Sequence, residues 1–213
     1  SIKVLFPYVE AGFGHITPLK SMKNAFEKKY GDQYEIVETY FYTQTGNEDL
    51  KKFNDLLCQQ VRMHNKCHLY GIANTIAVLV FGGRVCNWFC MKAIRPKAYK
   101  AGMEYLKSFN CDVVVSTHWA TNYYAMKMED RPLTIIYNPD IYRNLLFEYP
   151  ADLVLTPSED ICKKVVKRTK FTEDSFQPCA IAISENARNR ETDKKLLQKS
   201  LGFHNDIFTI CII

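Results

Sequence analysis

Apolar runs that resemble strands alternate with helical patterns along most of the chain. Mostly apolar stretches occupy residues 2–6, 34–41, 111–117, 133–137, 152–156 and 176–183, and each has the length and composition of a strand. Apolar side chains recur at helical spacing between them. This alternation predicts an α/β fold: a Rossmann-like, doubly wound parallel sheet with helices on both faces.

Two of the helices can be placed more closely. The first is expected to take Thr17 as its N-cap and Pro18 as its first residue, and to end at Gly31. A second helix after residue 47 would carry one apolar face, formed by Leu50, Phe53, Leu57, Val61 and His64.

The last thirty residues follow a different pattern. Residues 184–191 are charged and lack apolar periodicity, which is typical of a linker, and a short helix and a strand are expected after them. A parallel βα unit would normally continue with a loop and a helix. We therefore expect two parts: a Rossmann-like domain over residues 1–183, and a linker with the start of a truncated second domain over residues 184–213.

Three loops are expected to gather at one edge of the sheet, because each follows a strand: residues 10–15 (EAGFGH), 116–119 (STHW) and 138–140 (NPD). In the first loop, Gly12 and Gly14 allow close approach of a ligand, and the following helix N-terminus favours an anion. His15 can act as a general base, or it can be a turn histidine that only hydrogen-bonds. The loop matches neither the dinucleotide fingerprint nor the P-loop.

Composition and charge narrow the class of protein only slightly. The chain is 47% hydrophobic and 24% charged, as globular proteins are, and its formal net charge is +5. That charge suits an anionic partner or a solvated surface. Aromatic RNA-binding strands, helix-turn-helix patterns and arginine clusters are lacking, so no nucleic-acid partner is expected. The eight cysteines have no metal-ligand spacing, so no metal is expected either.

The segment over residues 69–99 combines an apolar stretch with aromatic and basic side chains. The apolar part is followed by Arg84, Trp88, Phe89, Lys92 and Arg95. This combination is typical of helices that lie in the interface of an anionic membrane. The alternative is a buried helix pair with a basic outer edge. The apolar stretch is too short and too interrupted to span a bilayer.

Several stretches resemble one family in the same order. They are residues 3–41 (KVLFPYVEAGFGHITPLKSMKNAFEKKYGDQYEIVETYF), 111–119 (CDVVVSTHW) and 134–167, which opens TIIYNPD, followed by the stretch after residue 176. Together they resemble the monogalactosyldiacylglycerol synthase and processive diacylglycerol glucosyltransferase group. The chain departs from that group at Pro139, where the family has Thr, and at residues 180–182, where Ala-Ile-Ala replaces Gly-Ile-Pro. These departures bear on the identity of the acceptor more than on the fold class.

The resemblance implies the N-terminal, acceptor-binding half of a two-domain GT-B glycosyltransferase. Such enzymes transfer a hexose from a nucleotide-sugar, here expected to be a UDP-sugar, to a diacylglycerol-type lipid with inversion and without metal or cofactor. By the same resemblance the protein would be cytoplasmic and peripheral at the membrane. His15 would be the base or would orient the acceptor, Asp140 would hold that imidazole or the acceptor, and Gly12 and Gly14 would lie near the donor phosphates.

The acceptor itself is expected at His118, Trp119 and Asn138, although His118 can equally be a structural residue. Two other functions remain open. One is a non-catalytic membrane- or ligand-binding module with the same fold. The other is a GT-B enzyme that acts on a polyprenyl-linked or small soluble alcohol.

Overall fold

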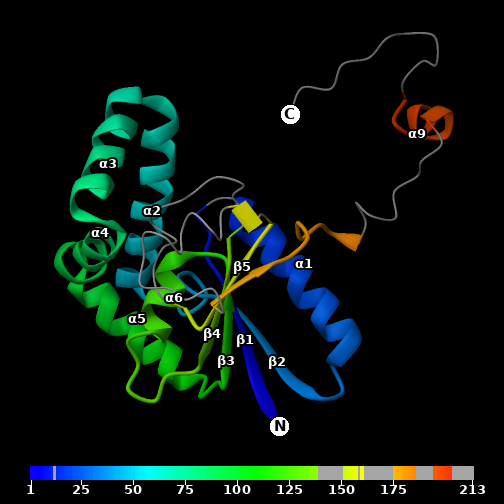
Figure 1. Cartoon of the computed structure of the whole chain (residues 1–213), viewed down its shortest axis with the longest axis horizontal. Helices are drawn as coiled ribbons and strands as arrows, with labels where there is room; N and C mark the ends of the chain where they lie inside the picture. The colour runs from blue at the N-terminus through cyan, green and yellow to red at the C-terminus, as the bar shows by residue number, and fades with distance from the viewer. Residues whose placement is uncertain (12, 139–150, 158, 161–174, 186–193, 203–213) are drawn as a thin grey trace. The chain divides into compact units, whose positions relative to one another are not determined.

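The computed structural model describes residues 1–11, 13–138, 151–157, 159–160, 175–185 and 194–202 (Figure 1). The chain divides into two compact units, Ser1–Ala182 and Ile183–Ile213. In the second unit the described helix is α9 (Lys194–Ser200), which lies where the sequence predicts one. The strand expected over residues 205–213 lies outside the described residues.

The first unit is built on a parallel sheet of six strands. In spatial order these are β2 (Tyr34–Tyr40), β1 (Ile2–Tyr8), β3 (Val113–Ser116), β4 (Leu133–Tyr137), β5 (Leu153–Thr156) and β6 (Phe176–Pro178). All five neighbouring pairs are parallel. The expected Rossmann-like parallel α/β fold is therefore confirmed.

The order of the strands reverses between β1 and β3. The chain leaves β1 through α1 (Phe13–Tyr30) to reach the edge strand β2, and then returns to pair β3 with the other side of β1. Loops at the carboxyl ends of two such strands diverge and leave a crevice, which is where ligands of open α/β sheets bind. The loops after β1 and β3 are the first two that the sequence pattern singles out.

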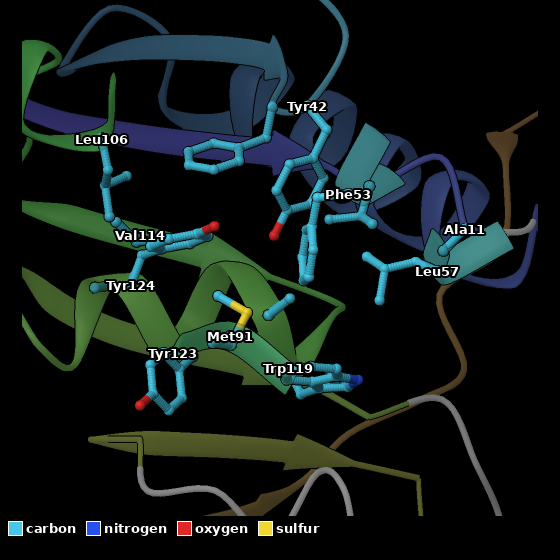
Figure 2. Packing of buried hydrophobic residues seen from close by; sticks show 14 of the residues in the cluster. Ala11, Tyr42, Phe53, Leu57, Met91, Leu106, Val114, Trp119, Tyr123 and Tyr124 are labelled. Carbon is cyan, nitrogen blue, oxygen red and sulfur yellow. The ribbon is translucent and has the colours of Figure 1, made fainter. Parts of the chain in front are cut away.

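Helices cover both faces of the sheet (Figure 1). On one face, α1 packs through Leu19 against Val4, Phe6 and Tyr8. The long excursion between β2 and β3 contains α2 (Glu48–Lys66), α3 (His68–Phe81), α4 (Gly83–Trp88), a π-helical turn η1 (Phe89–Ile94) and α5 (Pro96–Ser108). Helices α2, α5 and the short α6 (Trp119–Ala125) enclose the larger core on the opposite face (Figure 2).

The start of α1 differs from the prediction. The helix begins at Phe13 rather than after Thr17, so Pro18 lies inside it, and Thr17 accepts a hydrogen bond from the Ser21 hydroxyl at 2.9 Å. Proline at this depth removes the donor for the carbonyl of Gly14. Gly14 is exposed, so water can satisfy that carbonyl and the helix tolerates the loss.

The helical face predicted for α2 is only half buried. Leu50, Phe53 and Leu57 lie in the core, but Val61 is 43% exposed and His64 is also exposed. Beyond Leu57 the helix pairs with α3 instead of the sheet, and a Cβ added at Gly71 of α3 would lie 3.4 Å from the His64 ring. The last strand is also shorter than predicted, because β6 ends at Pro178 and Ile181 is exposed.

Gly102 of α5 offers a direct test of the packing in the larger core. A Cβ at this position would lie 2.6 Å from Cζ of the fully buried Tyr124. Overpacking of this kind costs about 1–3 kcal/mol, against a gain in helix propensity of about 1 kcal/mol. We predict that Gly102→Ala lowers the free energy of unfolding, measured with urea. The matched control is Gly14→Ala, where a Cβ would meet no atom within 4 Å. Equal stability of the two variants would contradict the packing described.

Candidate functional site

Two histidines meet in the crevice between β1 and β3. His15 lies in the first turn of α1, and His118 lies between β3 and α6. Their ring centroids are 4.8 Å apart and the rings are nearly perpendicular, at 82°. The fold therefore brings together two of the predicted site residues, which the sequence separates by about a hundred positions.

Two hydrogen bonds hold the loops that carry these histidines. The Nδ1 atom of His15 lies 2.8 Å from the carbonyl oxygen of Thr117, and the Thr117 hydroxyl donates to the carbonyl of His15 at 2.7 Å. A carbonyl oxygen only accepts, so Nδ1 of His15 carries the proton in this contact. In the neutral imidazole the lone pair is then on Nε2, which is the arrangement that a general base requires.

His118 has a structural task at the start of α6. Its Nδ1 accepts a hydrogen bond from the backbone N–H of Ala120 at 3.1 Å and so caps the helix. Burial, and secondly the neighbouring His15, hold the pKa of His118 well below the ordinary value of a histidine. The ring is therefore neutral at physiological pH, with its proton on Nε2. The helix cap is a structural role of the kind that the sequence left open for His118, and the residue also lines the cavity beside His15.

A cavity of about 280 Å³ opens beside the two histidines. Trp119, the first residue of α6, contributes to its wall and is 5% exposed. The remaining walls come from the glycine loop and from α2, α3, α4 and η1. They consist of Ala11, Leu57, Gln60, Val61, His64, Asn65, Tyr70, Asn74, Val78, Cys86, Asn87 and Cys90.

Helix α2 is fixed directly to the glycine loop. The Cys58 thiol donates to the carbonyl of Glu10 at 3.0 Å, and the core cluster of Figure 2 includes both Ala11 of the loop and Leu57 of the helix. The cavity is therefore an extension of the core beyond the edge of the sheet. Sequence reasoning did not find its helical wall. One available signal was that Gln60 and His64 lie four residues apart on α2, where the apolar face of the helix gives way to polar side chains.

The other predicted site residues have different outcomes. Gly14 is exposed in the first turn of α1, with open space in front of its Cα hydrogens. Asn138 is buried at the end of β4, where its backbone N–H donates to Leu155 at 2.9 Å, and it is not part of the cavity wall. Gly12 and Asp140 lie outside the described residues, as does the side chain of Arg84.

The segment predicted to contact membranes exposes its large apolar side chains. Trp88 is 50% exposed and Phe89 54% exposed. Exposed with them on α3, α4 and η1 are Leu69, Ile72, Ile76, Leu79, Val80, Phe81, Val85 and Ile94. The alternative of a buried helix pair is therefore wrong for these side chains. We refer to these ten residues as the apolar face.

The apolar face lies in a long stretch of the chain that has basic but no acidic residues. Residues 56–103 contain seven Lys and Arg residues and no Asp or Glu. Of the predicted basic contacts, Lys92 and Arg95 are exposed, and the ammonium of Lys92 lies 4.9 Å from the centre of the Tyr99 ring. Apolar exposure and unbalanced positive charge therefore coincide in one segment.

No described helix is by itself long and apolar enough to cross a membrane. His68–Phe81 and Val85–Ile94 satisfy the length and composition criteria only as a pair, with a bend of 111° between them. Among the described residues, no three His, Cys, Asp or Glu side chains gather as a metal site would require.

Comparison with known proteins gives no family assignment. No protein-family model matches the chain, and no curated protein matches it.

The buried neutral His118 predicts a pH dependence of stability. Its pKa is lower in the folded protein than the value of about 6.5 in the unfolded chain. Below pH 6.5 the unfolded state therefore binds more protons than the folded state. The free energy of unfolding decreases as the pH is lowered through this range, by at most about 1.4 kcal/mol per pH unit. His118→Asn keeps an N-cap acceptor and removes the titration. In urea unfolding at pH 7.5 and 5.5, we expect this variant to lose less stability than the wild type.

The control is His68→Asn, at an exposed position on α3 outside the cavity wall. It should show the pH dependence of the wild type. Loss of the same stability on acidification in all three proteins would contradict a buried, neutral His118.

Proposed function

We propose that the first unit is the acceptor-binding domain of an inverting GT-B glycosyltransferase that transfers a hexose from a nucleotide-sugar, a UDP-sugar, to a hydroxyl of a diacylglycerol-type lipid. The observation that carries the proposal is the orientation of His15. Its Nδ1–H is held by the Thr117 carbonyl, its Nε2 carries the lone pair, and the ring lines a cavity at the point where strand order reverses.

The chemistry follows from that orientation. The acceptor hydroxyl oxygen attacks the anomeric carbon of the donor while Nε2 of His15 takes the hydroxyl proton. The bond between that carbon and the diphosphate oxygen breaks, and the nucleoside diphosphate leaves with the bonding electrons. Attack from the opposite side inverts the anomeric centre. In this proposal the cavity and the crevice hold the acceptor hydroxyl in line with the anomeric carbon. Most of the increase in rate over the reaction in solution therefore comes from positioning.

The start of α1 supports the placement of the donor. The first N–H groups of a helix have no partner inside the helix, and together with the helix dipole they favour an anion. Gly14 belongs to this turn. Its φ is not positive, and a Cβ added at this position would meet no atom within 4 Å, so the described fold does not itself require a glycine here. A leaving diphosphate could therefore approach the backbone closely. In this proposal the nucleotide itself is bound by the donor-binding domain of the enzyme.

The apolar face supports a lipid as acceptor. Helices α3 and α4 and the turn η1 contribute both to the cavity wall and to the exposed apolar face. Insertion of this face into the headgroup region of an anionic membrane would bury the apolar side chains and place the basic ones near lipid phosphates. A lipid hydroxyl would then have a short route from the bilayer to His15.

The role of His15 is tested by His15→Ala in the chain joined to its donor-binding domain. Loss of a general base lowers turnover by about 10²- to 10⁴-fold, so we expect a decrease of at least about tenfold in hexose transfer from UDP-sugar to diacylglycerol. The reaction is followed as labelled glycolipid. His68→Ala removes an exposed histidine outside the cavity wall and should keep normal turnover. Normal turnover of His15→Ala would remove His15 from its proposed role.

The membrane contact is tested by replacing both Trp88 and Phe89 with serine. Full burial of a large apolar side chain is worth about 1.5–3 kcal/mol, so losing two half-exposed ones should weaken binding to anionic liposomes at least about tenfold in flotation. The control is Leu133→Ser, also half exposed but at the start of β4, away from the apolar face. Unchanged flotation of the double variant would favour a small soluble acceptor.

A further inference from the structure

The cavity beside the histidines has an unusual lining for so basic a region. Its helical walls carry four amide side chains, which we call the amide wall: Gln60 and Asn65 of α2, Asn74 of α3 and Asn87 of α4. Two aromatic side chains, Tyr70 and Trp119, line the same space. Among the described residues that form the cavity, none is Asp, Glu, Lys or Arg.

We propose that this cavity is a subsite for an uncharged headgroup with several hydroxyls, a polyol or a single sugar ring, carried on an alkyl or acyl chain. The proposal rests on the proposed function for the reaction that takes place there, but binding can be tested without that reaction. It adds the class of headgroup that the site selects and assigns the selection to the amide wall.

The absence of Asp, Glu, Lys and Arg side chains from the described walls selects against anionic headgroups. A phosphate or carboxylate that entered would lose hydration and meet no lysine or arginine to compensate for it. The positive charge of this region is placed elsewhere, as with Lys92, whose ammonium lies over Tyr99. The two cavity thiols are also uncharged, because burial raises the pKa of Cys86 and raises that of Cys90 to about 11.

The amide wall has the chemistry that hydroxyl groups need. Each amide offers two N–H donors and a carbonyl acceptor, and a hydroxyl both donates and accepts. These amides converge from three helices, so several hydroxyls of one ligand can be bound at once. The volume of about 280 Å³ lies at the lower end of small-molecule sites, which suits one ring or one glycerol unit rather than a nucleotide.

The apolar part of the lining accounts for the hydrophobic chain. Leu57, Val61 and Val78 line the cavity, and Val61 is 43% exposed, so apolar lining reaches the surface there. A ligand with a hydroxyl-rich head and an apolar tail can therefore satisfy both kinds of wall. A free sugar has no tail to contact the apolar lining, and a simple alcohol has only one hydroxyl to offer the amide wall.

The test measures binding of short amphiphiles to the chain in the absence of any nucleotide-sugar. The probes are butyl β-glucoside, butyl phosphate and 1-butanol, which share a tail and differ in headgroup. Titrations are followed by NMR chemical shifts of residues that line the cavity. We expect butyl glucoside to bind at least about tenfold more tightly than either other probe. Equal or tighter binding of butyl phosphate would overturn the proposal, and so would binding of butanol as tight as that of the glucoside.

The amide wall is tested with Asn65→Leu combined with Asn74→Leu. Both positions are exposed at the rim of the cavity, so the variant should fold, which circular dichroism and urea unfolding check. We expect the preference for butyl glucoside over butanol to fall to within about threefold. The control is Gln59→Leu, an exposed α2 amide outside the cavity wall, which should keep the preference. An unchanged preference in the double variant would overturn the assignment.

This experiment separates the subsite from the proposed reaction. If hexose transfer is absent but glucoside binding is selective and needs the amide wall, the subsite stands and the catalytic proposal fails. If transfer depends on His15 but no glucoside selectivity is found, the catalytic proposal stands and the subsite fails.

Discussion

The pair of hydrogen bonds between His15 and Thr117 joins the ends of β1 and β3, and the rest of the site depends on it. Each residue contributes both a side-chain atom and a backbone carbonyl, so loops that are 102 positions apart are fixed relative to each other. The contact also determines which nitrogen of His15 carries the proton. It thereby gives the imidazole a defined tautomer and direction at the crevice where the strand order reverses.

The excursion between β2 and β3 turns that crevice into a cavity with two kinds of wall. Leu50, Phe53 and Leu57 anchor α2 in the core, and the helix then continues past the sheet and pairs with α3. Because α3 has little to pack against except α2 and α4, most of its large side chains remain exposed. The same helices line the cavity beside the histidines with four amide side chains and with Leu57, Val61 and Val78. An apolar exterior and a cavity lined by both amide and apolar side chains is the arrangement that a lipid with a neutral headgroup would require.

Much of the fold could be predicted from the sequence, because buried parallel strands are continuous apolar runs and helices show their own period. The meeting of the loops after β1 and β3 could be expected for the same reason. The start of α1 could not, since the rule that places proline in the first turn was overridden at Pro18 by a helix that begins in the glycine loop. The amide wall was missed because Asn65, Asn74 and Asn87 become neighbours only through the packing of α2, α3 and α4, which no local pattern in the sequence records.

The proposed reaction requires that His15 presents a lone pair on Nε2 to an acceptor hydroxyl in the cavity. Its most direct test is ¹⁵N NMR of the histidine rings at pH 7.5, with the His15 signals assigned by comparison with His15→Gln. We expect a neutral His15 protonated at Nδ1, and a change in the Nε2 shift, but not in the Nδ1 shift, when butyl β-glucoside is added. A His15 ring protonated at Nε2, or an Nε2 signal that does not respond to the bound glucoside, would contradict it.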